Sequence, residues 1–253
     1  MDIEIIPCLN DNYSYLFKDN QTDTVAIIDP SEFGPCDKKI NQKYKKLDFI
    51  LNTHHHFDHV GGNAELKKKY GAKILGFEKD KKRIPEIDAL LKDGQELKIG
   101  NLNVKTIFIP GHTSGHIAFY FEKEKVVFTG DTLFSLGCGR VFEGTYKQMF
   151  ESLNKIKSLP GDTKIYCGHE YTKNNLGFCV KFNPNNKYLK DKEKVLKAKI
   201  KDGKPTIPST IKEEIQTNIF LRYDDVDVKN ALNLKNASDL EIFTKLRDLK
   251  DNF

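Results

Sequence analysis

The sequence contains one dense group of residues able to bind metal ions, the run His-His-His-Phe-Asp-His at positions 54–59. Neutral imidazoles and carboxylates are common protein ligands of zinc, iron and manganese. In an extended segment, side chains two residues apart share a face, so His54 and His56 can converge on one ion. Asp58 and His59 come after the chain begins to turn, and they can face a second ion. The spacing therefore predicts ligands for two metal ions.

The residues around this run favour a metal site over a chance tract of surface histidines. The short apolar segment 47–51 is typical of a buried strand, so the histidines follow directly where a strand ends. Gly61 and Gly62 come soon after the Asp-His pair. His55 points away from its two neighbours on such a segment, and we expect it to support the ligands or to pack beside them.

Further along the chain, three more predicted strands each lead to a potential ligand. Strands 102–109, 126–129 and 164–167 are followed by His112, Asp131 and His169. Functional loops collect along one edge of a sheet that is covered by helices, so these side chains can meet the first group in one cleft. Taken alone, His112 would be an ordinary loop histidine and Asp131 a turn residue. Together with the first group they complete a set for two ions.

The pattern of secondary structure changes after Tyr171. Strand patterns recur up to that residue, whereas the later part of the chain has helical periodicity only, in residues 174–182, 188–201, 209–219 and 237–249. We therefore expect a domain boundary near residue 171, with an all-helical domain after it.

Composition limits the kind of protein. The chain has 253 residues, 30% charged residues and a formal net charge of +5, and its lysines are interleaved with acids. We expect solvated helix faces rather than a nucleic-acid interface, and no membrane association, because no apolar stretch approaches the length of a membrane span. The N-terminus does not have the pattern of a signal peptide. The five scattered cysteines predict reduced thiols and a cytoplasmic protein.

Three stretches resemble one enzyme family closely. They are 53–63, with the metal-binding run; 130–145, with Gly130-Asp131-Thr132-Leu133-Phe134 and Gly137-Cys138-Gly139-Arg140; and Cys167-Gly168-His169-Glu170-Tyr171-Thr172. Together with the tail Lys250-Asp251-Asn252-Phe253, they resemble glyoxalase II, the hydroxyacylglutathione hydrolases of the metallo-β-lactamase superfamily. The resemblance implies a four-layer αββα sandwich over residues 1–171, carrying a dinuclear metal hydrolase site. It also implies a helical substrate-binding domain over residues 172–253.

The resemblance also implies a role for each site residue. One ion would be held by His54, His56 and His112, the other by Asp58, His59 and His169, with Asp131 bridging them; Asp58 and Asp131 are the expected catalytic carboxylates. The expected glutathione contacts are Arg140, Phe142, Tyr171, Arg247 and Lys250. Many members of the family have tyrosine where this chain has Phe142, so one hydroxyl group is missing from the expected set.

The implied reaction is hydrolysis of S-2-hydroxyacylglutathione thioesters by a hydroxide held between two divalent ions. S-D-lactoylglutathione would give D-lactate and glutathione, the second step of methylglyoxal detoxification. Zinc is the expected metal, with iron and manganese as alternatives, and a monomer is expected. The alternatives are a mononuclear iron persulfide dioxygenase, a tRNA-processing nuclease of the same superfamily, and a non-catalytic protein on the same fold. The complete ligand set and the lack of an inserted basic arm favour the hydrolase.

Overall fold

The apolar segments of the N-terminal half form a six-stranded sheet in the computed structural model, which describes residues 1–253. Its strands follow chain order: β1 (Asp2–Cys8), β2 (Asn12–Lys18), β3 (Val25–Ile28), β4 (Phe49–Leu51), β5 (Lys73–Phe77) and β6 (Ala89–Leu91). β1, β2 and β3 are antiparallel neighbours, whereas β3 to β6 are parallel. Every residue of β3 is buried, as expected of a parallel strand covered on both faces.

Four antiparallel strands form a second layer, in the order β10-β9-β8-β7. They are β7 (Glu96–Ile99), β8 (Leu102–Phe108), β9 (Ile117–Phe121) and β10 (Val126–Gly130). Aromatic side chains join the two layers: the ring centroid of Phe17 lies 5.3 Å from that of Phe121, and that of Tyr15 lies 5.2 Å from that of Phe128. All four rings are buried, so the core of this sandwich lies between the layers.

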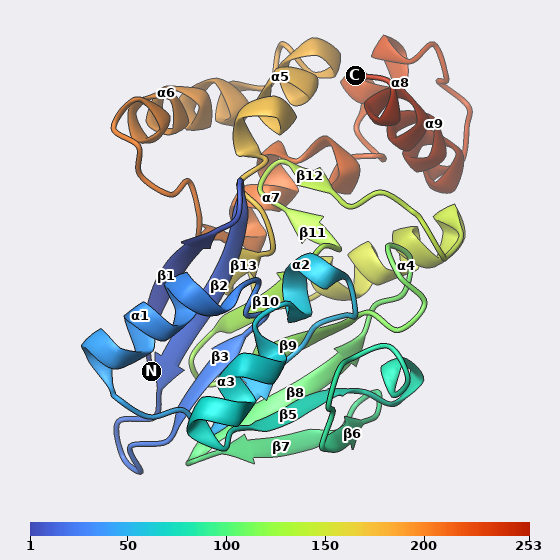
Figure 1. Cartoon of the computed structure of the whole chain (residues 1–253). Coiled ribbons are helices and arrows are strands. Elements are labelled where there is room, and N and C mark those ends of the chain that lie inside the picture. The colour runs from blue at the N-terminus through green and yellow to red at the C-terminus, as the bar shows by residue number, and fades with distance from the viewer. The chain divides into compact units, whose positions relative to one another are not determined.

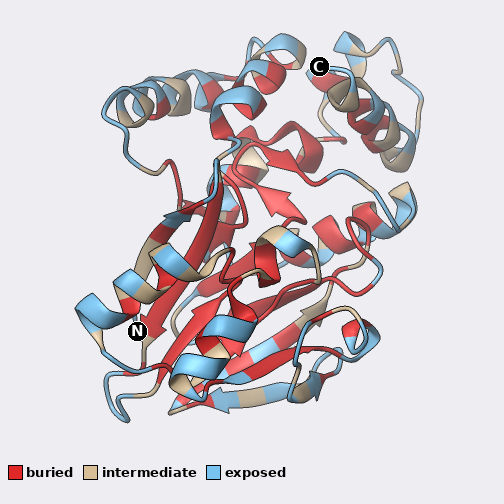
Figure 2. Ribbon diagram, viewed as in Figure 1, coloured by how far each residue is buried: buried red, intermediate tan, exposed pale blue.

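Two helices, α1 (Phe33–Lys43) and α3 (Asn63–Tyr70), cover the other face of the first sheet, and both contain buried as well as exposed residues (Figures 1 and 2). The inner face of α1 contributes Cys36 and Ile40 to the core of the sheet. α3 ends at Gly71, whose φ of 70° is a left-handed conformation that suits glycine. The single turn α2 (Phe57–Val60) contains part of the metal-binding run.

The chain packs as two compact units. The first unit comprises residues 1–108 and 114–130, and the second comprises residues 109–113 and 131–253. This division by packing does not follow the expected boundary near residue 171, which stays a prediction. The first unit contains both layers described above, and the second contains the hairpin β11 (Leu133–Phe134) and β12 (Gly137–Cys138).

The second unit is mainly helical. Its helices are α4 (Tyr146–Lys157), α5 (Thr172–Phe182), α6 (Lys187–Lys201), α7 (Ile211–Thr217), α8 (Val226–Ala231) and α9 (Asp239–Asp251). The prediction of helices only after Tyr171 needs one correction, because β14 (Ser209–Thr210) pairs antiparallel with β13 (Lys164–Cys167). A strand of two residues has no periodicity of its own, and its pairing with a distant segment is invisible in the local sequence.

A buried carboxylate ties the β11–β12 hairpin to the helices of the second unit. Glu214 on α7 is fully buried and accepts hydrogen bonds from the Leu136 backbone N–H at 2.7 Å and from Lys192 Nζ at 2.6 Å. It also accepts a hydrogen bond from Asn218 Nδ2 at 3.0 Å, and Asn218 donates to the Gly137 carbonyl at 3.0 Å. The hairpin is therefore held at both its turn and its second strand.

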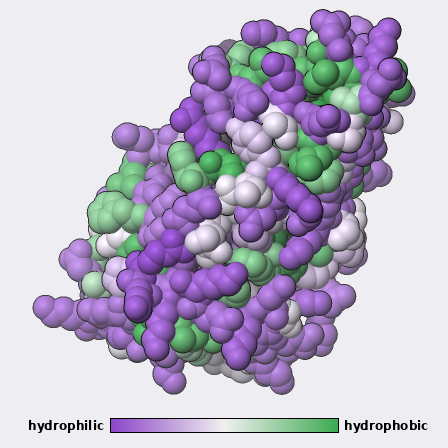
Figure 3. All heavy atoms as spheres, turned by 90° about the vertical axis from the view of Figure 1, so that its right-hand side faces the viewer, coloured by the Kyte–Doolittle hydropathy of each residue, from purple (hydrophilic) through white to green (hydrophobic).

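One face of the molecule is largely polar. Hydrophilic residues dominate the face drawn in Figure 3, where the hydrophobic areas are separate from one another. None of the helices combines the length and the apolar character that crossing a lipid bilayer requires.

Candidate metal centre and substrate pocket

The first unit gathers the metal-binding run directly after β4. His54 and His59 are fully buried, and the ring centroid of His54 lies 4.7 Å from that of His56 and 4.2 Å from that of His59. Asp58 is held from the side, because Asn12 Nδ2 donates to its carboxylate at 2.9 Å and to its backbone carbonyl at 3.0 Å. The four residues expected to bind metal thus lie together within this unit.

Asp29 orients these histidines, although no role was predicted for it. Its carboxylate accepts hydrogen bonds from the Thr53 hydroxyl at 2.6 Å and from His59 Nδ1 at 3.1 Å. Because the Thr53 hydroxyl donates to Asp29, its oxygen accepts from His54 Nδ1 at 3.0 Å. Both rings therefore donate from Nδ1 and present Nε2 as the ligand atom, the arrangement by which outer carboxylates orient metal-bound histidines. Asp29 follows strand β3, and this position was the available signal.

Two further histidines of the first unit support the run. His55 has its Nδ1 3.5 Å from Asp80 Oδ2, and its ring centroid lies 5.1 Å from that of His56. His116 stacks on His54, with ring centroids 4.6 Å apart and an interplanar angle of 19°. A Cβ atom at Gly130 would lie 2.8 Å from His116, and Gly130 has a φ of 46°, so both space and conformation require glycine there.

The second unit brings the other three expected ligands together. His169 Nε2 lies 3.1 Å and His112 Nε2 lies 3.5 Å from the same oxygen, Oδ2 of Asp131. Two ligand atoms on one tetrahedral ion, with bonds of about 2.0–2.1 Å, would lie about 3.3 Å apart. The distances from Asp131 Oδ2 to His112 Nε2 and to His169 Nε2 are both close to this value. They would suit an Asp131 carboxylate that shares one ion with His112 and a second ion with His169. The donor set and the spacing therefore suit divalent metal ions.

The loop after β12 fixes His112 for this role. His112 Nδ1 lies 2.8 Å from the Arg140 carbonyl oxygen. Because a carbonyl can only accept, Nδ1 is the donor, and Nε2 is left as the ligand atom. The Gly139 backbone N–H donates to the Thr132 carbonyl at 3.2 Å, and a Cβ atom at Gly139 would lie 1.9 Å from the Asp131 carbonyl oxygen. Only glycine permits this close approach to the backbone of Asp131, the residue whose carboxylate the ions would share.

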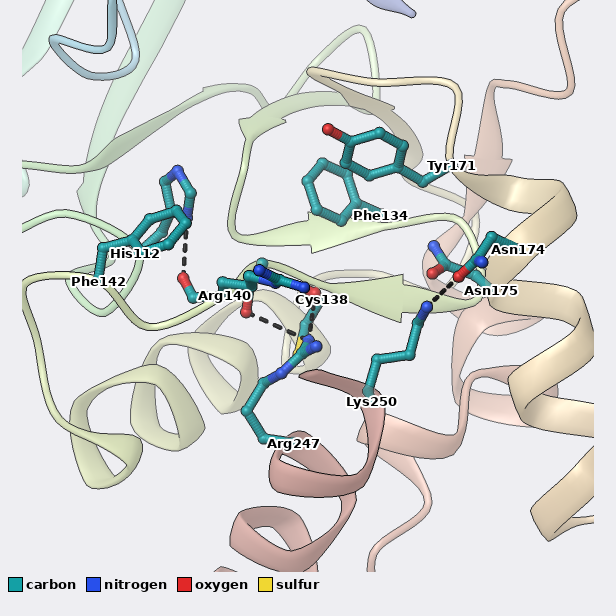
Figure 4. A pocket seen from close by; sticks show the side chains of 11 residues that line it. His112, Phe134, Cys138, Arg140, Phe142, Tyr171, Asn174, Asn175, Arg247 and Lys250 are labelled. Atoms are coloured by element: carbon teal, nitrogen blue, oxygen red, sulfur yellow. Dashed lines mark hydrogen bonds between the residues drawn. The ribbon is translucent and has the colours of Figure 1, made fainter. Parts of the chain in front are cut away.

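A cavity of 510 Å³ adjoins His112 within the second unit (Figure 4). Its volume is within the range of about 300–1,000 Å³ that is typical of small-molecule sites. It is lined by His112, Phe134, Cys138, Gly139, Arg140, Phe142, Tyr171, Asn174, Asn175, Arg247 and Lys250. All five expected substrate contacts therefore line one cavity, together with one expected metal ligand. Asn174 and Asn175 were not among the predicted site residues.

The aromatic residues form one side of this cavity. Tyr171 stacks on His169 with ring centroids 4.6 Å apart and an interplanar angle of 5°, and it packs edge-on against Phe134 at 5.2 Å. Phe142, with 62% of its surface exposed, lies 5.2 Å from the ring of His112. Tyr171 and Phe142 thus each contact an expected metal ligand and also line the cavity.

The three cations of the cavity differ in their surroundings. The Arg140 side chain is 58% exposed, whereas that of Arg247 is only 3% exposed. Arg247 NH1 donates to the Cys138 carbonyl at 2.7 Å, and its NH2 donates to Asp251 Oδ1 at 2.9 Å. Lys250 donates to Asn174 Oδ1, and burial lowers the pKa of its ammonium group, helped by repulsion from Arg247. Arg247 is therefore a buried support of β12 and not a cation on the helix surface.

Two family models match consecutive parts of the chain. Residues 10–169 match the metallo-beta-lactamase superfamily, and residues 170–253 match the hydroxyacylglutathione hydrolase C-terminus. A protein named hydroxyacylglutathione hydrolase from Pelagibacter ubique (strain HTCC1062) is 55% identical over 253 residues, which is 100% of both chains.

Solved structures share the fold. The crystal structure of ETHE1 from Myxococcus xanthus has a TM-score of 0.70 at 22% identity and covers 98% of this chain and 90% of that chain. The crystal structure of TTHA1623 in a di-iron-bound form has a TM-score of 0.56 at 27% identity, covering 67% of this chain and 92% of that chain. The fold and the His and Asp clusters indicate a dinuclear metal site. This chain belongs to the metallo-β-lactamase superfamily and, within it, to the hydroxyacylglutathione hydrolase family.

Proposed function

We propose that this chain hydrolyses S-2-hydroxyacylglutathione thioesters and converts S-D-lactoylglutathione to D-lactate and glutathione. One observation carries the proposal: a single cavity is lined by an expected metal ligand, His112, and by the cations Arg140 and Lys250. Glutathione has two carboxylates, so a cavity lined by cations and by a metal ligand suits its thioesters. The 55% identity to a protein named hydroxyacylglutathione hydrolase supports the same reaction.

The proposed metal ligands are those expected from the sequence. His54, His56 and His112 would hold one ion, Asp58, His59 and His169 the other, and Asp131 would bridge them. The distances around Asp131 Oδ2 and the orientation of His54 and His59 by Asp29 support this assignment within each unit. Zinc is the proposed metal, with iron and manganese as alternatives, since this mixture of imidazole and carboxylate suits all three.

The residues of the chain prepare the site for hydrolysis in three ways. When bound, two ions supply Lewis acidity and lower the pKa of a water molecule toward neutrality. Asp29 and the Arg140 carbonyl hold ligand histidines in one tautomer, and Asp131 offsets positive charge where the thioester reacts. The leaving thiolate is comparatively stable, because a thiol has a pKa of about 8.5, so a strong general acid is less necessary than in amide hydrolysis.

Binding of the glutathione part would come from the cations and aromatic rings of the cavity. We propose that Arg140 and Lys250 contact its carboxylates and that Tyr171 and Phe142 contact its peptide atoms. Arg247 would act through its neighbours, because its guanidinium already donates to Cys138 and Asp251. These contacts exist before and during the reaction, so their loss should mainly raise KM.

A comparison of two thioesters tests the proposal. Purified protein should hydrolyse S-D-lactoylglutathione, releasing free thiol, and should be far slower on the D-lactoyl thioester of N-acetylcysteamine, which lacks the charged groups of glutathione. Equal rates of hydrolysis of the two thioesters would contradict the proposed role of the cations. Consumption of oxygen with a persulfide of glutathione, and no thioester hydrolysis, would favour a dioxygenase instead.

We also propose a cytoplasmic monomer that does not act on nucleic acid or membranes. All five cysteines are free and buried, which supports a reducing compartment. Analytical ultracentrifugation tests the monomer: a sedimentation mass near 29.0 kDa is expected, and twice that mass would contradict it.

A further inference from the structure

Asp251 occupies an unusual place beside the cavity. It is the last residue of α9, and its Oδ1 atom lies 2.9 Å from Arg247 NH2 and 3.4 Å from Arg140 Nε. The Asp251 backbone carbonyl also accepts a hydrogen bond of 3.4 Å from Arg140 NH2. One carboxylate therefore touches two of the three cations that line the cavity (Figure 4 shows the cations).

Local helix chemistry does not explain an acid at this position. The C-terminal end of a helix carries partial negative charge, so a carboxylate in the last turn is unfavourable. An ion pair spaced four residues apart is also weaker when the basic residue precedes the acid, as Arg247 precedes Asp251. Where a residue violates local preferences in this way, a functional reason is expected.

The two arginine contacts differ in strength. Arg247 is buried and its contact with Asp251 is short, so it fixes the carboxylate in place. Arg140 is 58% exposed and its contacts with Asp251 are long, so it can exchange partners. Lys250 is already repelled by both arginines, which lowers the pKa of its ammonium group after the larger effect of burial. A carboxylate here therefore balances the cations while no ligand is bound.

We propose that Asp251 limits the affinity for the glutathione part by competing for Arg140 with the carboxylate of the ligand. This inference rests on the proposed function, because it takes Arg140 as a contact of the glutathione part. Binding of a thioester replaces the Asp251–Arg140 contact, while Arg247 keeps Asp251 close enough to repel the incoming carboxylate. Asp251 thereby weakens binding of substrate and of the product glutathione alike, and it favours release of the product.

The test compares Asp251→Asn with Asp248→Asn as a matched control. Asp248 lies one turn earlier on α9, is exposed, and accepts a hydrogen bond from the Tyr146 hydroxyl at 2.6 Å rather than from an arginine. Both variants lose one negative charge from the same helix, but only one of them releases Arg140. The measurements are KM and kcat for S-D-lactoylglutathione, the inhibition constant of glutathione, and the inhibition constant of glutathione diethyl ester, whose carboxylates are blocked.

For Asp251→Asn we expect KM and the inhibition constant of glutathione to fall about three- to fivefold, the size of an exposed charge effect. The inhibition constant of the diethyl ester should not change, and Asp248→Asn should leave all four values within experimental error. A general change of structure would change the inhibition constant of the diethyl ester as well. Asp251→Ser, which also removes the charge, repeats the test if the asparagine variant does not fold.

Two results would overturn the inference. An unchanged or raised KM for Asp251→Asn would mean that Asp251 positions Arg140 for the ligand and does not compete with it. An equal fall in Asp248→Asn would mean that only the total charge of the helix matters. Absence of thioester hydrolysis by the unaltered protein would instead contradict the proposed function, so the two failures are distinguishable.

Discussion

Replacement of Arg247 by methionine tests whether this residue mainly supports β12 from a buried position or mainly contacts the substrate. The substitution keeps an unbranched side chain of similar length but removes every donor. In the structure, Arg247 NH1 donates to the Cys138 carbonyl at 2.7 Å, NH2 donates to Asp251 at 2.9 Å, and the guanidinium lies 5.1 Å from the ring centroid of Phe220. Only 3% of the side chain is exposed, so water cannot replace these bonds without rearrangement.

The size of the effect follows from these contacts. Leaving one partner of a buried ion pair alone costs about 3–5 kcal/mol, and an unsatisfied buried carbonyl costs about 1–3 kcal/mol. The carboxylate of Asp251 is 32% exposed and regains some hydration, which reduces the first contribution. We therefore expect Arg247→Met to lower the free energy of unfolding by about 2–4 kcal/mol. Replacement of an exposed cation would lower the free energy of unfolding by only about 1 kcal/mol or less.

Activity should change as well, because β12 leads directly into the loop that carries Arg140. The Arg140 carbonyl orients His112, so a loosened β12 disturbs both the cation and a metal ligand. We expect Arg247→Met to raise KM and also to lower kcat, whereas loss of a contact made equally in both states would raise KM alone. Arg247→Lys should recover part of the stability, since the ammonium group can still reach one of the acceptors.

The assays are urea denaturation at fixed metal concentration and steady-state hydrolysis of S-D-lactoylglutathione. Arg140→Met is the matched control: its side chain is 58% exposed, so it should raise KM and change the free energy of unfolding by less than about 1 kcal/mol. If Arg247→Met behaves like this control, with a small loss of stability and an effect on KM alone, then Arg247 is mainly a ligand contact and the reasoning from its burial is wrong.

Four further predictions follow from single residues. Asp131→Ala should abolish hydrolysis and release at least one metal ion, and near-normal turnover with two bound ions would contradict its bridging role. Glu214→Gln should lower the free energy of unfolding by about 3–5 kcal/mol, because it leaves Lys192 without its buried partner; a loss below about 1 kcal/mol in urea denaturation would refute this. Hydrogen bonds from the Thr22 hydroxyl and the Asn101 backbone N–H lower the pKa of Asp19 from 3.8 to about 2. Asp19→Asn should therefore destabilise the protein above the unfolded-state pKa, and the difference in stability from the unaltered protein should vanish as the pH falls through about 2. Phe142→Tyr adds a hydroxyl beside the cavity and should lower KM about two- to tenfold, and an unchanged KM would show that this position does not contact the substrate.

Much of the site was predictable because strand ends and ligand types are local features of a sequence. The run at 54–59 follows β4 as expected, and Asp131 follows β10. The role of Asp29 was not predicted, although it follows β3 in the same manner. Its function depends on which side chains a neighbouring parallel strand presents, and that information comes from the pairing of β3 with β4.

In the C-terminal part, the spacing of apolar residues predicts the helices and their buried faces, but not every helix boundary. Ile242, Phe243, Leu246 and Arg247 are all buried on α9, at the spacing of one helix face. The position of Arg247 on this apolar stripe was the available sign that it is not a surface cation. α7 begins at Ile211, two residues after the predicted start at Ser209, since Thr210 and Glu213 form a complete capping box and Ser209 belongs to β14.

The dinuclear site can be tested most directly by measuring metal content and thioester hydrolysis on the same samples. Protein freed of metal with a chelator would be titrated with zinc, with bound metal and the rate of S-D-lactoylglutathione hydrolysis recorded at each step. We expect the rate to rise until two ions are bound per chain and then to remain constant, and His112→Ala and His169→Ala each to bind fewer ions. Full activity at one ion per chain, or two bound ions with no hydrolysis of the thioester, would contradict a dinuclear hydroxyacylglutathione hydrolase.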